Sequence, residues 1–460
     1  MERDTICAIS TPFGISGIGI IRLSGKETYR IIEEIFVPGK DPFKKKKFKI
    51  EKIPSHTVHY GHIVNDGKVI DEVIVTIMKS PKSYTKEDMA EIGCHGGLIP
   101  LKEVLNLCIK KGARLAEPGE FTKRAFLNGR IDLTQAESVI DIIYSKTESA
   151  LEIGMKKLKG SLNEFISKIK EKILNILVLI EAKINFPEEE DISDFQFDLK
   201  KEINYLLDEI EKFLLRNNKG KIIQNGINVA IIGSPNVGKS SLLNTFLKEE
   251  RAIVTEIPGT TRDAIIEVIN IKGVPINIID TAGIRKAKNK IEKIGVEKAI
   301  GWMKKAEINL LILDGSRKLN EYDLQLMEYI KEKPYIIIIN KIDLPQKIEI
   351  EKIYKDFPEN RIIKASIKNL IGIEEIENKI WELIKEGFGE IKGDEIYLNL
   401  RQEDKIRKIK NYIEQALKEK EIEILAEILN YCLNEIDELI GNRYSEKILD
   451  EIFSNFCIGK

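Results

Sequence analysis

The sequence has 460 residues and a mass of 52.5 kDa, and because single hydrophobic cores stop growing at about 250 to 300 residues, we expect two or three domains. With 43% hydrophobic and 32% charged residues the chain is globular rather than disordered. Its 73 Lys and Arg residues balance 74 Asp and Glu residues, so composition does not indicate a protein that coats nucleic acid or an acidic membrane.

The cysteines and the lengths of the apolar runs indicate the cellular compartment in which the protein works. Five cysteines, an odd number without a C-x-x-C pair, argue against a disulfide framework and a zinc site. The charged start Met1–Cys7 lacks the apolar region of a signal peptide. Apolar runs such as 176–180 and 335–339 are far shorter than the roughly 20 residues of a membrane span, and we interpret them as a buried helix and a buried strand. A cytoplasmic protein without membrane insertion is expected.

Residues 1–118 are predicted to form a compact α/β or α+β domain. Short β-branched runs at 58–64 and 69–78 are broken by glycines, and a helical stretch covers 98–110. Residues 119–217 differ, because apolar residues from Leu162 to Ile184 recur at helical spacing.

A second apolar stripe runs from Ile203 to Leu214, and the Asn-Asn-Lys-Gly segment at 217–220 is interpreted as a linker. Strands and helices then alternate through 218–387, which is typical of a parallel sheet with crossover helices. Helical periodicity resumes in 388–460. We therefore expect an α/β multidomain fold in which a mostly parallel α/β domain is inserted into a helical domain, whose two halves pack together.

A phosphate-binding loop is predicted at Gly233–Ser240, which fits G-x-x-x-x-G-K-[ST] between an apolar run at 229–232 and the helical segment 241–247. Its glycines let backbone N–H groups turn toward phosphates, Lys239 reaches the β and γ phosphates, and Ser240 can bind Mg²⁺. A chance glycine-rich turn is the alternative, but the strand, loop and helix context disfavours it.

Two further motifs follow predicted strands. Asp280-Thr-Ala-Gly283 offers an aspartate that can hold the metal through water and a glycine N–H for the γ-phosphate. Asn340-Lys-Ile-Asp343 resembles the base-recognition motif of the GTPase superfamily, whose aspartate accepts the guanine N1–H and amino donors that adenine lacks. Ser366-Ile-Lys368 lies where that superfamily has Ser-Ala-Lys, and a backbone contact to the base would survive the change to Ile367. GTP is therefore expected over ATP.

The hydrolytic machinery differs from that of Ras-type enzymes, which have a water-orienting Gln where this chain has Ile284. Because an isoleucine cannot position water, the transition-state charge needs another partner, for which a metal cation is one solution. Asn236 in the phosphate loop and Gly259–Asp263 are candidates, although Asn236 could equally be a turn residue.

Taken together, these residues resemble the MnmE (TrmE) family of tRNA-modification GTPases, among the TrmE-Era-EngA-like P-loop GTPases, over essentially the whole chain. The motifs that carry the resemblance are Asp4–Ala8, Gly17–Gly25, Ser83–Asp88, Cys94–Gly97, Pro118–Arg130, Gly259–Asp263 and Phe456–Lys460.

The resemblance implies a potassium-dependent GTPase with a Ras-like domain. Asn236, Thr255, Ile257 and Thr260 would hold K⁺, Thr261 would join Ser240 on Mg²⁺, and Glu292 would position water when two GTPase domains pair. Without the family, Glu292 is one exposed acid in a charged helix. The implied catalytic residues are Glu292, Asn236, Lys239, Gly259 and Thr260. The implied nucleotide-binding residues are Asn236, Val237, Gly238, Lys239, Ser240, Ser241, Thr255, Glu256, Ile257, Pro258, Gly259, Thr260, Thr261, Asp280, Thr281, Ala282, Gly283, Asn340, Lys341, Asp343, Ser366, Ile367 and Lys368.

For the first domain the resemblance implies a constitutive homodimer that binds 5-formyl- or 5,10-methylene-tetrahydrofolate through Arg22, Glu91, Arg130 and Lys460. A carboxylate suits pterin donors, and basic groups suit the acidic glutamyl end. Lys86 departs from the glycine usual in this family and could alter a turn.

Cys457 is a candidate reactive thiol. The alternative, a small buried hydrophobic residue without a chemical role, is favoured because no neighbouring base is visible except Lys460.

The function implied by the resemblance is GTP hydrolysis coupled to tRNA modification. With an FAD-dependent partner, MnmG, in a heterotetramer or larger complex, the chain would help to install an aminomethyl or carboxymethylaminomethyl group on C5 of the wobble uridine, U34, using a tetrahydrofolate one-carbon unit. Two alternatives are a GTP-driven ribosome-assembly switch, which has no need for the folate residues, and a freestanding folate-dependent aminomethyl transferase, which leaves the nucleotide domain without a purpose.

Overall fold

The computed structural model describes residues 4–43, 48–185, 192–248, 266–280 and 300–460. The chain divides into two compact units. Unit 1 comprises Met1–Ile140, Lys157–Glu188 and Glu419–Lys460, and unit 2 comprises Asp141–Lys156 and Glu189–Lys418. No helix in the described part of the chain is long and apolar enough to cross a membrane.

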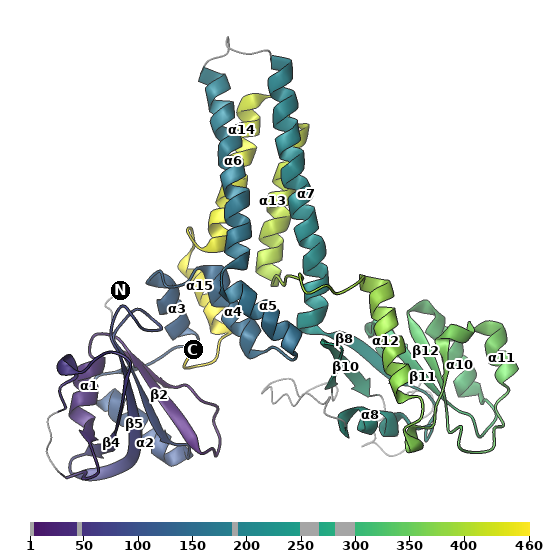
Figure 1. Ribbon diagram of the computed structural model, residues 1–460, viewed down its shortest axis with the longest axis horizontal. Coiled ribbons are helices and arrows are strands. Elements are labelled where there is room, and N and C mark those ends of the chain that lie inside the picture. Colours follow the sequence, from purple (N-terminus) through teal and green to yellow (C-terminus); the bar gives the residue numbers. More distant parts are fainter. Residues whose placement is uncertain (1–3, 44–47, 186–191, 249–265, 281–299) are drawn as a thin grey trace. The chain divides into compact units, whose positions relative to one another are not determined.

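Within its described residues, unit 1 contains a seven-stranded sheet in the order β3-β4-β5-β6-β2-β1-β7, antiparallel except for the β1–β7 pair. The helices α1 (Thr28–Ile35) and α2 (Leu98–Lys110) contribute to the same apolar core as the sheet (Figure 1). Of the two expected classes this is α+β, and the predicted strands and helix are confirmed. The strands are β1 (Ile6–Ile9), β2 (Ile18–Ser24), β3 (Phe36–Pro38), β4 (Thr57–Asn65), β5 (Lys68–Met78), β6 (Met89–His95) and β7 (Arg114–Leu115).

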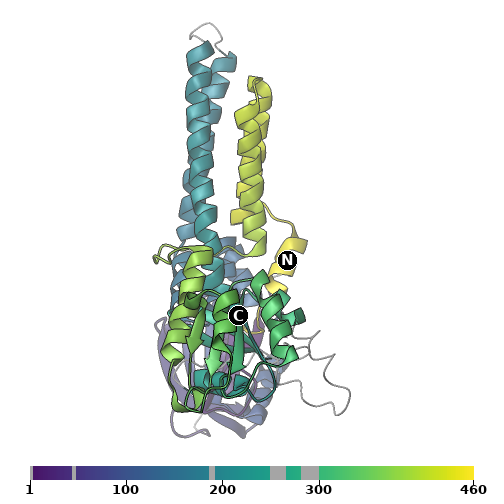
Figure 2. The same cartoon turned by 90° about the vertical axis from the view of Figure 1, so that its right-hand side faces the viewer.

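Unit 1 also contains a helical pair formed by segments that are far apart in the sequence. The long helix α6 (Ser161–Asn185) runs alongside α14 (Ile422–Ile440) in both views (Figures 1 and 2). Its predicted apolar stripe is buried from Leu162 to Ile180, whereas Ile184 is 43% exposed. Lys170 pairs with Asp437 at 2.7 Å across the contact. The expectation that helices before and after the inserted domain pack together is therefore confirmed. Shorter helices of unit 1 are α3 (Glu120–Leu127), most of α4 (Leu133–Ile143) and α15 (Glu446–Ser454), whereas α5 (Glu148–Leu158) lies mostly in unit 2.

In unit 2, α13 (Leu400–Lys418) packs against α7 (Ile192–Asn225), and the predicted linker at 217–220 is wrong, because these residues continue α7. Asn217 is fully buried and its Oδ1 accepts the N–H of Leu398 at 2.7 Å. A Cβ on Gly220 would lie 1.9 Å from the carbonyl oxygen of Ile396. Both residues contact the segment around Ile396 and Leu398, which leads from the α/β domain back to the helices.

The described part of unit 2 contains a six-stranded sheet in the order β13-β12-β11-β8-β10-β9, in which only β9 runs antiparallel to its neighbour. This confirms the mostly parallel inserted domain. The strands are β8 (Ile227–Ile232), β9 (Ile266–Ile271), β10 (Val274–Asp280), β11 (Ile308–Asp314), β12 (Tyr335–Asn340) and β13 (Ile362–Lys364). The flanking helices are α8 (Lys239–Lys248), α10 (Glu321–Tyr329), α11 (Ile350–Asp356) and α12 (Ile373–Phe388).

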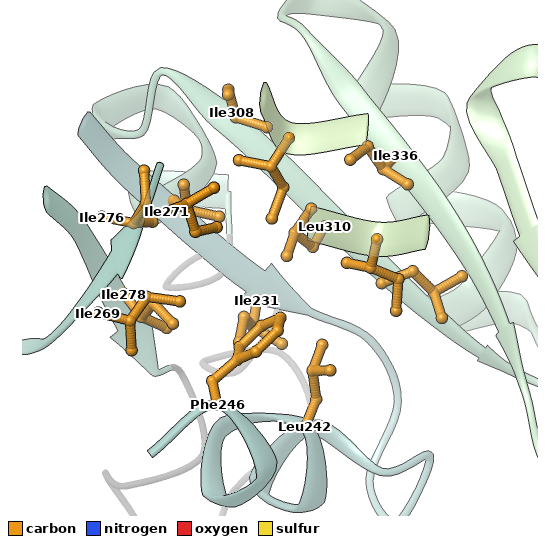
Figure 3. Close-up of a cluster of buried hydrophobic side chains, with 14 of the residues drawn as sticks. Ile231, Leu242, Phe246, Ile269, Ile271, Ile276, Ile278, Ile308, Leu310 and Ile336 are labelled. Atoms are coloured by element: carbon orange, nitrogen blue, oxygen red, sulfur yellow. The ribbon is translucent and has the colours of Figure 1, made fainter. Parts of the chain in front are cut away.

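The core of this domain explains its placement of the phosphate loop. Leu242 and Phe246 of α8 are buried against Ile231 of β8 (Figure 3), so the helix that follows the phosphate loop is fixed on the sheet. Such contacts place the loop at the carboxyl edge of a parallel sheet, where open α/β folds bind ligands. Short 3₁₀ turns occur at Ile50–Lys52, Ile330–Glu332, Glu359–Arg361 and Ile367–Asn369.

Candidate functional site

The phosphate loop connects β8 to the start of α8. Gly233 has φ +145°, and a Cβ there would lie 2.3 Å from the carbonyl oxygen of Ile312, so only glycine fits. Lys239, the first residue of α8, donates from Nζ to the carbonyl oxygens of Gly233 at 2.8 Å and Ser234 at 2.7 Å. The ammonium and the helix N-terminus therefore both place positive potential at the loop, which suits phosphate.

A buried aspartate on a different element holds the loop in place. The Ser234 hydroxyl donates to Asp323 at 2.6 Å, and Asp323 is 1% exposed and pairs with Arg317 at 2.8 Å. Asp323 also completes a capping box with Asn320 at the start of α10. Sequence analysis missed this anchor, although the Asn-x-x-Asp spacing before a helix is a recognisable cap signal.

Asn340 joins the phosphate loop to the loop after β13. The side chain is 4% exposed, donates from Nδ2 to the carbonyl oxygen of Val237 at 2.8 Å, and accepts the N–H of Ile367 at 3.0 Å. A Cβ on Gly238 would lie 2.3 Å from Asn340 Nδ2, so this close contact also requires glycine. The N–H of Ile367, which the sequence assigned to the base, donates to Asn340 in this structure, while its side chain joins the core.

The proposed base-recognition carboxylate is held in an ionised state. The Ser366 hydroxyl donates to Asp343 Oδ1 at 2.6 Å, and this hydrogen bond lowers the pKa of the Asp343 carboxyl. Asp343 and Lys368 are exposed. Lys341 pairs with Asp314 at 2.5 Å. The structure thus brings the predicted residues after β12 and β13 together beside the loop, and an exposed carboxylate there can accept two N–H donors.

Oxygen-bearing side chains lie at the loop in positions that fit cations. Asn236 is exposed with φ +65°, and no other described residue hydrogen-bonds to its side chain. Ser240 follows Lys239 in the first turn of α8 and is exposed, as is Ser241. Amide and hydroxyl oxygens are ligands for hard cations, so this donor set fits K⁺ at Asn236 and Mg²⁺ at Ser240.

One further residue of the predicted nucleotide site lies in the described part of the chain. Asp280 ends β10, where its backbone lies opposite Ile231 of β8, close to the start of the phosphate loop. The other predicted residues lie outside the described part of the chain, and these are Thr255, Glu256, Ile257, Pro258, Gly259, Thr260, Thr261, Thr281, Ala282, Gly283 and Glu292.

A second candidate site lies in unit 1, where Arg22 of β2 faces Glu91 of β6 in the antiparallel register. Arg22 donates to Glu91 Oε1 from Nε at 2.9 Å, and the two side chains are 16% and 26% exposed. Arg22 Nη1 also donates to the carbonyl oxygen of Gly459 at 3.1 Å, which brings the C-terminal segment to the pair. Glu91 Oε2 accepts no hydrogen bond from any described residue, so a ligand donor can use it.

Lys460 and Arg130 complete this predicted set. Burial, and secondly the nearby Arg22 guanidinium, lower the pKa of Lys460. The Arg130 guanidinium lies 4.6 Å from the centroid of the Tyr84 ring, and that of Arg22 lies 5.5 Å from the same centroid. Sequence analysis did not single out Tyr84, whose only signal was an aromatic residue within a polar motif. This arrangement fits a folate, because the unused oxygen of Glu91 can accept from pterin N–H donors and the cations can pair with the glutamyl carboxylates.

Two residues singled out from the sequence have definite positions here. Lys86 has φ +57°, the left-handed conformation that glycine adopts easily, so the turn keeps the glycine-like geometry despite the substitution. Cys457 is exposed, so its interpretation as a buried residue is wrong. Its chemical reactivity stays a prediction.

Comparisons with known proteins agree over the full chain. The model of the MnmE helical domain matches residues 133–457, and that of the GTP-binding protein TrmE N-terminus matches residues 5–130. The tRNA modification GTPase MnmE of Thermoanaerobacter pseudethanolicus is 47% identical, with 100% of each chain covered. The protein of that name from Carboxydothermus hydrogenoformans is 43% identical with the same coverage, and that of Bacillus pumilus is 42% identical over 99% of this chain and 100% of its own. The chain therefore belongs to the MnmE family of tRNA modification GTPases.

Proposed function

We propose that this chain is a cytoplasmic, potassium-dependent GTPase that acts with an FAD-dependent MnmG-type partner on C5 of U34 in certain tRNAs. The product would be an aminomethyl or carboxymethylaminomethyl uridine whose one-carbon unit comes from tetrahydrofolate. We assign 1–118 to folate binding and dimerisation, 119–217 and 388–460 to the helical domain, and 218–387 to the GTPase domain.

The observation that carries the GTPase assignment is the Asp343 carboxylate, which Ser366 holds at 2.6 Å beside the phosphate loop. In this position it would accept the guanine N1–H and amino group, while Asn340 ties the base loop to the phosphate loop. Lys239 would contact the β and γ phosphates and stabilise charge as the terminal phosphoryl group is transferred to water.

A K⁺ ion held by Asn236, Thr255, Ile257 and Thr260 would supply the positive charge that Ras-type enzymes obtain from a finger arginine. Mg²⁺ on Ser240 and Thr261 would neutralise phosphate charge. Glu292 would orient the attacking water, a role that Ile284 cannot fill. The exposed Asn236 amide, with no described partner, supports the K⁺ assignment.

Folate binding is supported by the Arg22–Glu91 pair and the half-buried Lys460. Glu91 would accept pterin N–H donors, and the basic groups would attract the glutamyl carboxylate. A homodimer is supported by exposed apolar side chains near the start of β2 and α2, because Ile15 is 100%, Ile18 67% and Ile99 68% exposed. A hydrogen bond from the backbone N–H of Ser16 to the carbonyl oxygen of Gly96 joins the segment before β2 to the segment before α2.

The experiment is steady-state GTP hydrolysis by the full chain in KCl and in NaCl at equal ionic strength. We expect strong stimulation by K⁺ that Asn236→Ala removes while GTP binding persists. Asn378→Ala, in α12, serves as the matched amide control and should retain the stimulation. Equal wild-type rates in the two salts would contradict the potassium assignment and leave the GTPase assignment standing.

The ribosome-assembly alternative makes a different prediction, because it gives no role to the folate residues. Full-length family membership favours tRNA modification over it. Binding of 5-formyl-tetrahydrofolate would count strongly against that alternative. A freestanding transferase would show folate turnover that Lys239→Ala leaves unchanged, whereas the proposed function requires both sites.

A further inference from the structure

An open hollow of about 450 Å³ lies in unit 1 between the loop after β5, the residue before β4 and the short turn that follows α3. Its volume falls within the range of small-molecule sites, roughly 300 to 1,000 Å³. The lining residues are His56, Met78, Pro81, Lys82, Ser83, Tyr84, Lys86 and Arg130.

The charge of this lining has one sign. Lys82, Lys86 and Arg130 carry positive charge, and no aspartate or glutamate is among the lining residues. No described carboxylate forms an ion pair with any of these three cations. A concave surface with cations and no carboxylates attracts a ligand with several negative charges.

The nearest acids in the chain are engaged elsewhere. Glu87 accepts the Ser24 hydroxyl at 2.7 Å and pairs with Arg124 at 3.2 Å. Asp88 accepts the N–H of Ser80 at 3.0 Å. The charge of Glu87 is therefore matched by Arg124, and neither carboxylate is among the residues that line the hollow.

The walls are fixed before any ligand arrives. Lys86 Nζ donates to the carbonyl oxygen of Gly129 at 2.7 Å, and Asn128 donates to the carbonyl oxygen of Thr85 at 2.7 Å, so the two sides of the hollow are joined. Two of the lining residues, His56 at φ +62° and Lys86 at φ +57°, hold left-handed backbone without being glycine. Such strain concentrates at ligand-binding sites, and a fixed site loses less entropy on binding.

Tyr84 connects the hollow to the proposed folate residues. Its ring is a lining group of the hollow and has the guanidinium of Arg130 at 4.6 Å and that of Arg22 at 5.5 Å from its centroid. Arg22 in turn holds Glu91. A ligand whose donor-rich ring lies on Glu91 and whose chain passes Tyr84 therefore reaches the cations of the hollow.

We propose that the hollow binds the γ-linked oligoglutamate tail of a polyglutamylated folate, an inference that rests on the proposed folate binding. Each added glutamate brings one carboxylate, and Lys82, Lys86 and Arg130 supply the matching charges. In this arrangement the pterin lies at Glu91, the middle of the folate passes Tyr84, and the oligoglutamate tail lies in the hollow.

The test is calorimetric titration of the full chain with 5-formyl-tetrahydrofolate bearing one or five glutamates. We expect the pentaglutamate to bind about tenfold more tightly, and the advantage to shrink as salt rises, because the charges are partly exposed. Lys82→Gln and Lys86→Gln should each reduce the ratio of the two affinities roughly threefold. Lys86→Gly, which removes the charge and relaxes the backbone, should reduce this affinity ratio by the same factor. Lys102→Gln, on α2, is the exposed-lysine control and should leave the ratio unchanged.

The outcomes separate this inference from the proposed function. Monoglutamate binding with no advantage for the pentaglutamate overturns the tail site and leaves folate binding intact. Absence of binding by either form overturns both. If the Lys82 and Lys86 variants weaken tRNA binding but keep the pentaglutamate advantage, the hollow serves RNA phosphates instead and the inference is wrong.

Discussion

The two candidate sites are built in different ways. In the nucleotide site each ligand-binding motif is a short run of the chain, as in the contact of Lys239 with Gly233 six residues earlier, and Asp323 and Asn340 hold the phosphate loop from other elements. In the folate site, Arg22 contacts Glu91 and Gly459, which are 69 and 437 residues away. In a parallel sheet, repeated βα units bring their loops to one edge, where a site can form. In the antiparallel sheet of unit 1, the site depends on the register that pairs Arg22 with Glu91 and on the C-terminal segment at Gly459.

The largest effect should come from Asp343→Asn, which removes the acceptor for both guanine donors. GTP affinity should fall at least about a hundredfold, because sites built to hydrogen-bond a substrate strongly reject an unmatched one. Xanthosine triphosphate should regain affinity, since the new amide can donate to the oxygen at position 2. Nucleotide titration measures both, with the exposed Asp356→Asn as control. Unchanged GTP affinity would show that another residue reads the base.

Arg22→Met should affect only the folate site. We expect 5-formyl-tetrahydrofolate affinity to fall roughly tenfold to a hundredfold, because a cation is lost and Glu91 is left half-buried without its partner. GTP affinity should stay the same. The exposed Arg30→Met, which breaks pairs with Glu27 and Glu34, is the matched control in the same unit. Equal losses of folate binding in both variants would mean that Arg22 acts only through general charge.

Gly220→Ala tests whether distant contacts also matter in the nucleotide half of the chain. The added Cβ would meet the Ile396 carbonyl oxygen at 1.9 Å, so despite the better helix propensity of alanine we expect a loss of about 1 to 3 kcal/mol of stability. Gly387→Ala in α12 has no atom within 4 Å and should be stabilising by up to about 1 kcal/mol. Thermal unfolding of the two variants gives the comparison, and stabilisation by both would refute the close packing at Gly220.

Ser366→Ala should give the smallest effect. The Ser366 hydrogen bond lowers the pKa of Asp343, so its loss should raise that pKa toward the usual value. The carboxylate accepts guanine donors only when ionised, and the acid limb of GTP affinity should therefore move to higher pH. Titrations between about pH 4 and 6 measure this limb. An unmoved limb would mean that Ser366 does not tune the carboxyl.

Much of the fold could be predicted because hydrophobic period and turn chemistry are local. The buried run of β12 and the apolar stripe of α6 both appear in the structure as predicted. The error at 217–220 has a physical cause. Asparagine and glycine usually mark turns, but here Asn217 and Gly220 are selected by contact with Leu398 and Ile396, about 180 residues later.

The candidate sites differ in the same way. The phosphate loop and Asp343 follow from motif spacing after buried strands, whereas the pairing of Arg22 with Glu91 requires the register of β2 and β6. Family resemblance pointed to both residues without giving their contact. Tyr84 and Asp323 were missed because their partners come from other elements of the fold.

The most direct measurement of the two-site account is titration of the full-length chain with 5-formyl-tetrahydrofolate while saturating GDP is bound. The account predicts one folate per chain with GDP retained, because separate residues hold each ligand. Release of GDP by folate, or no folate binding with or without GDP, would contradict it.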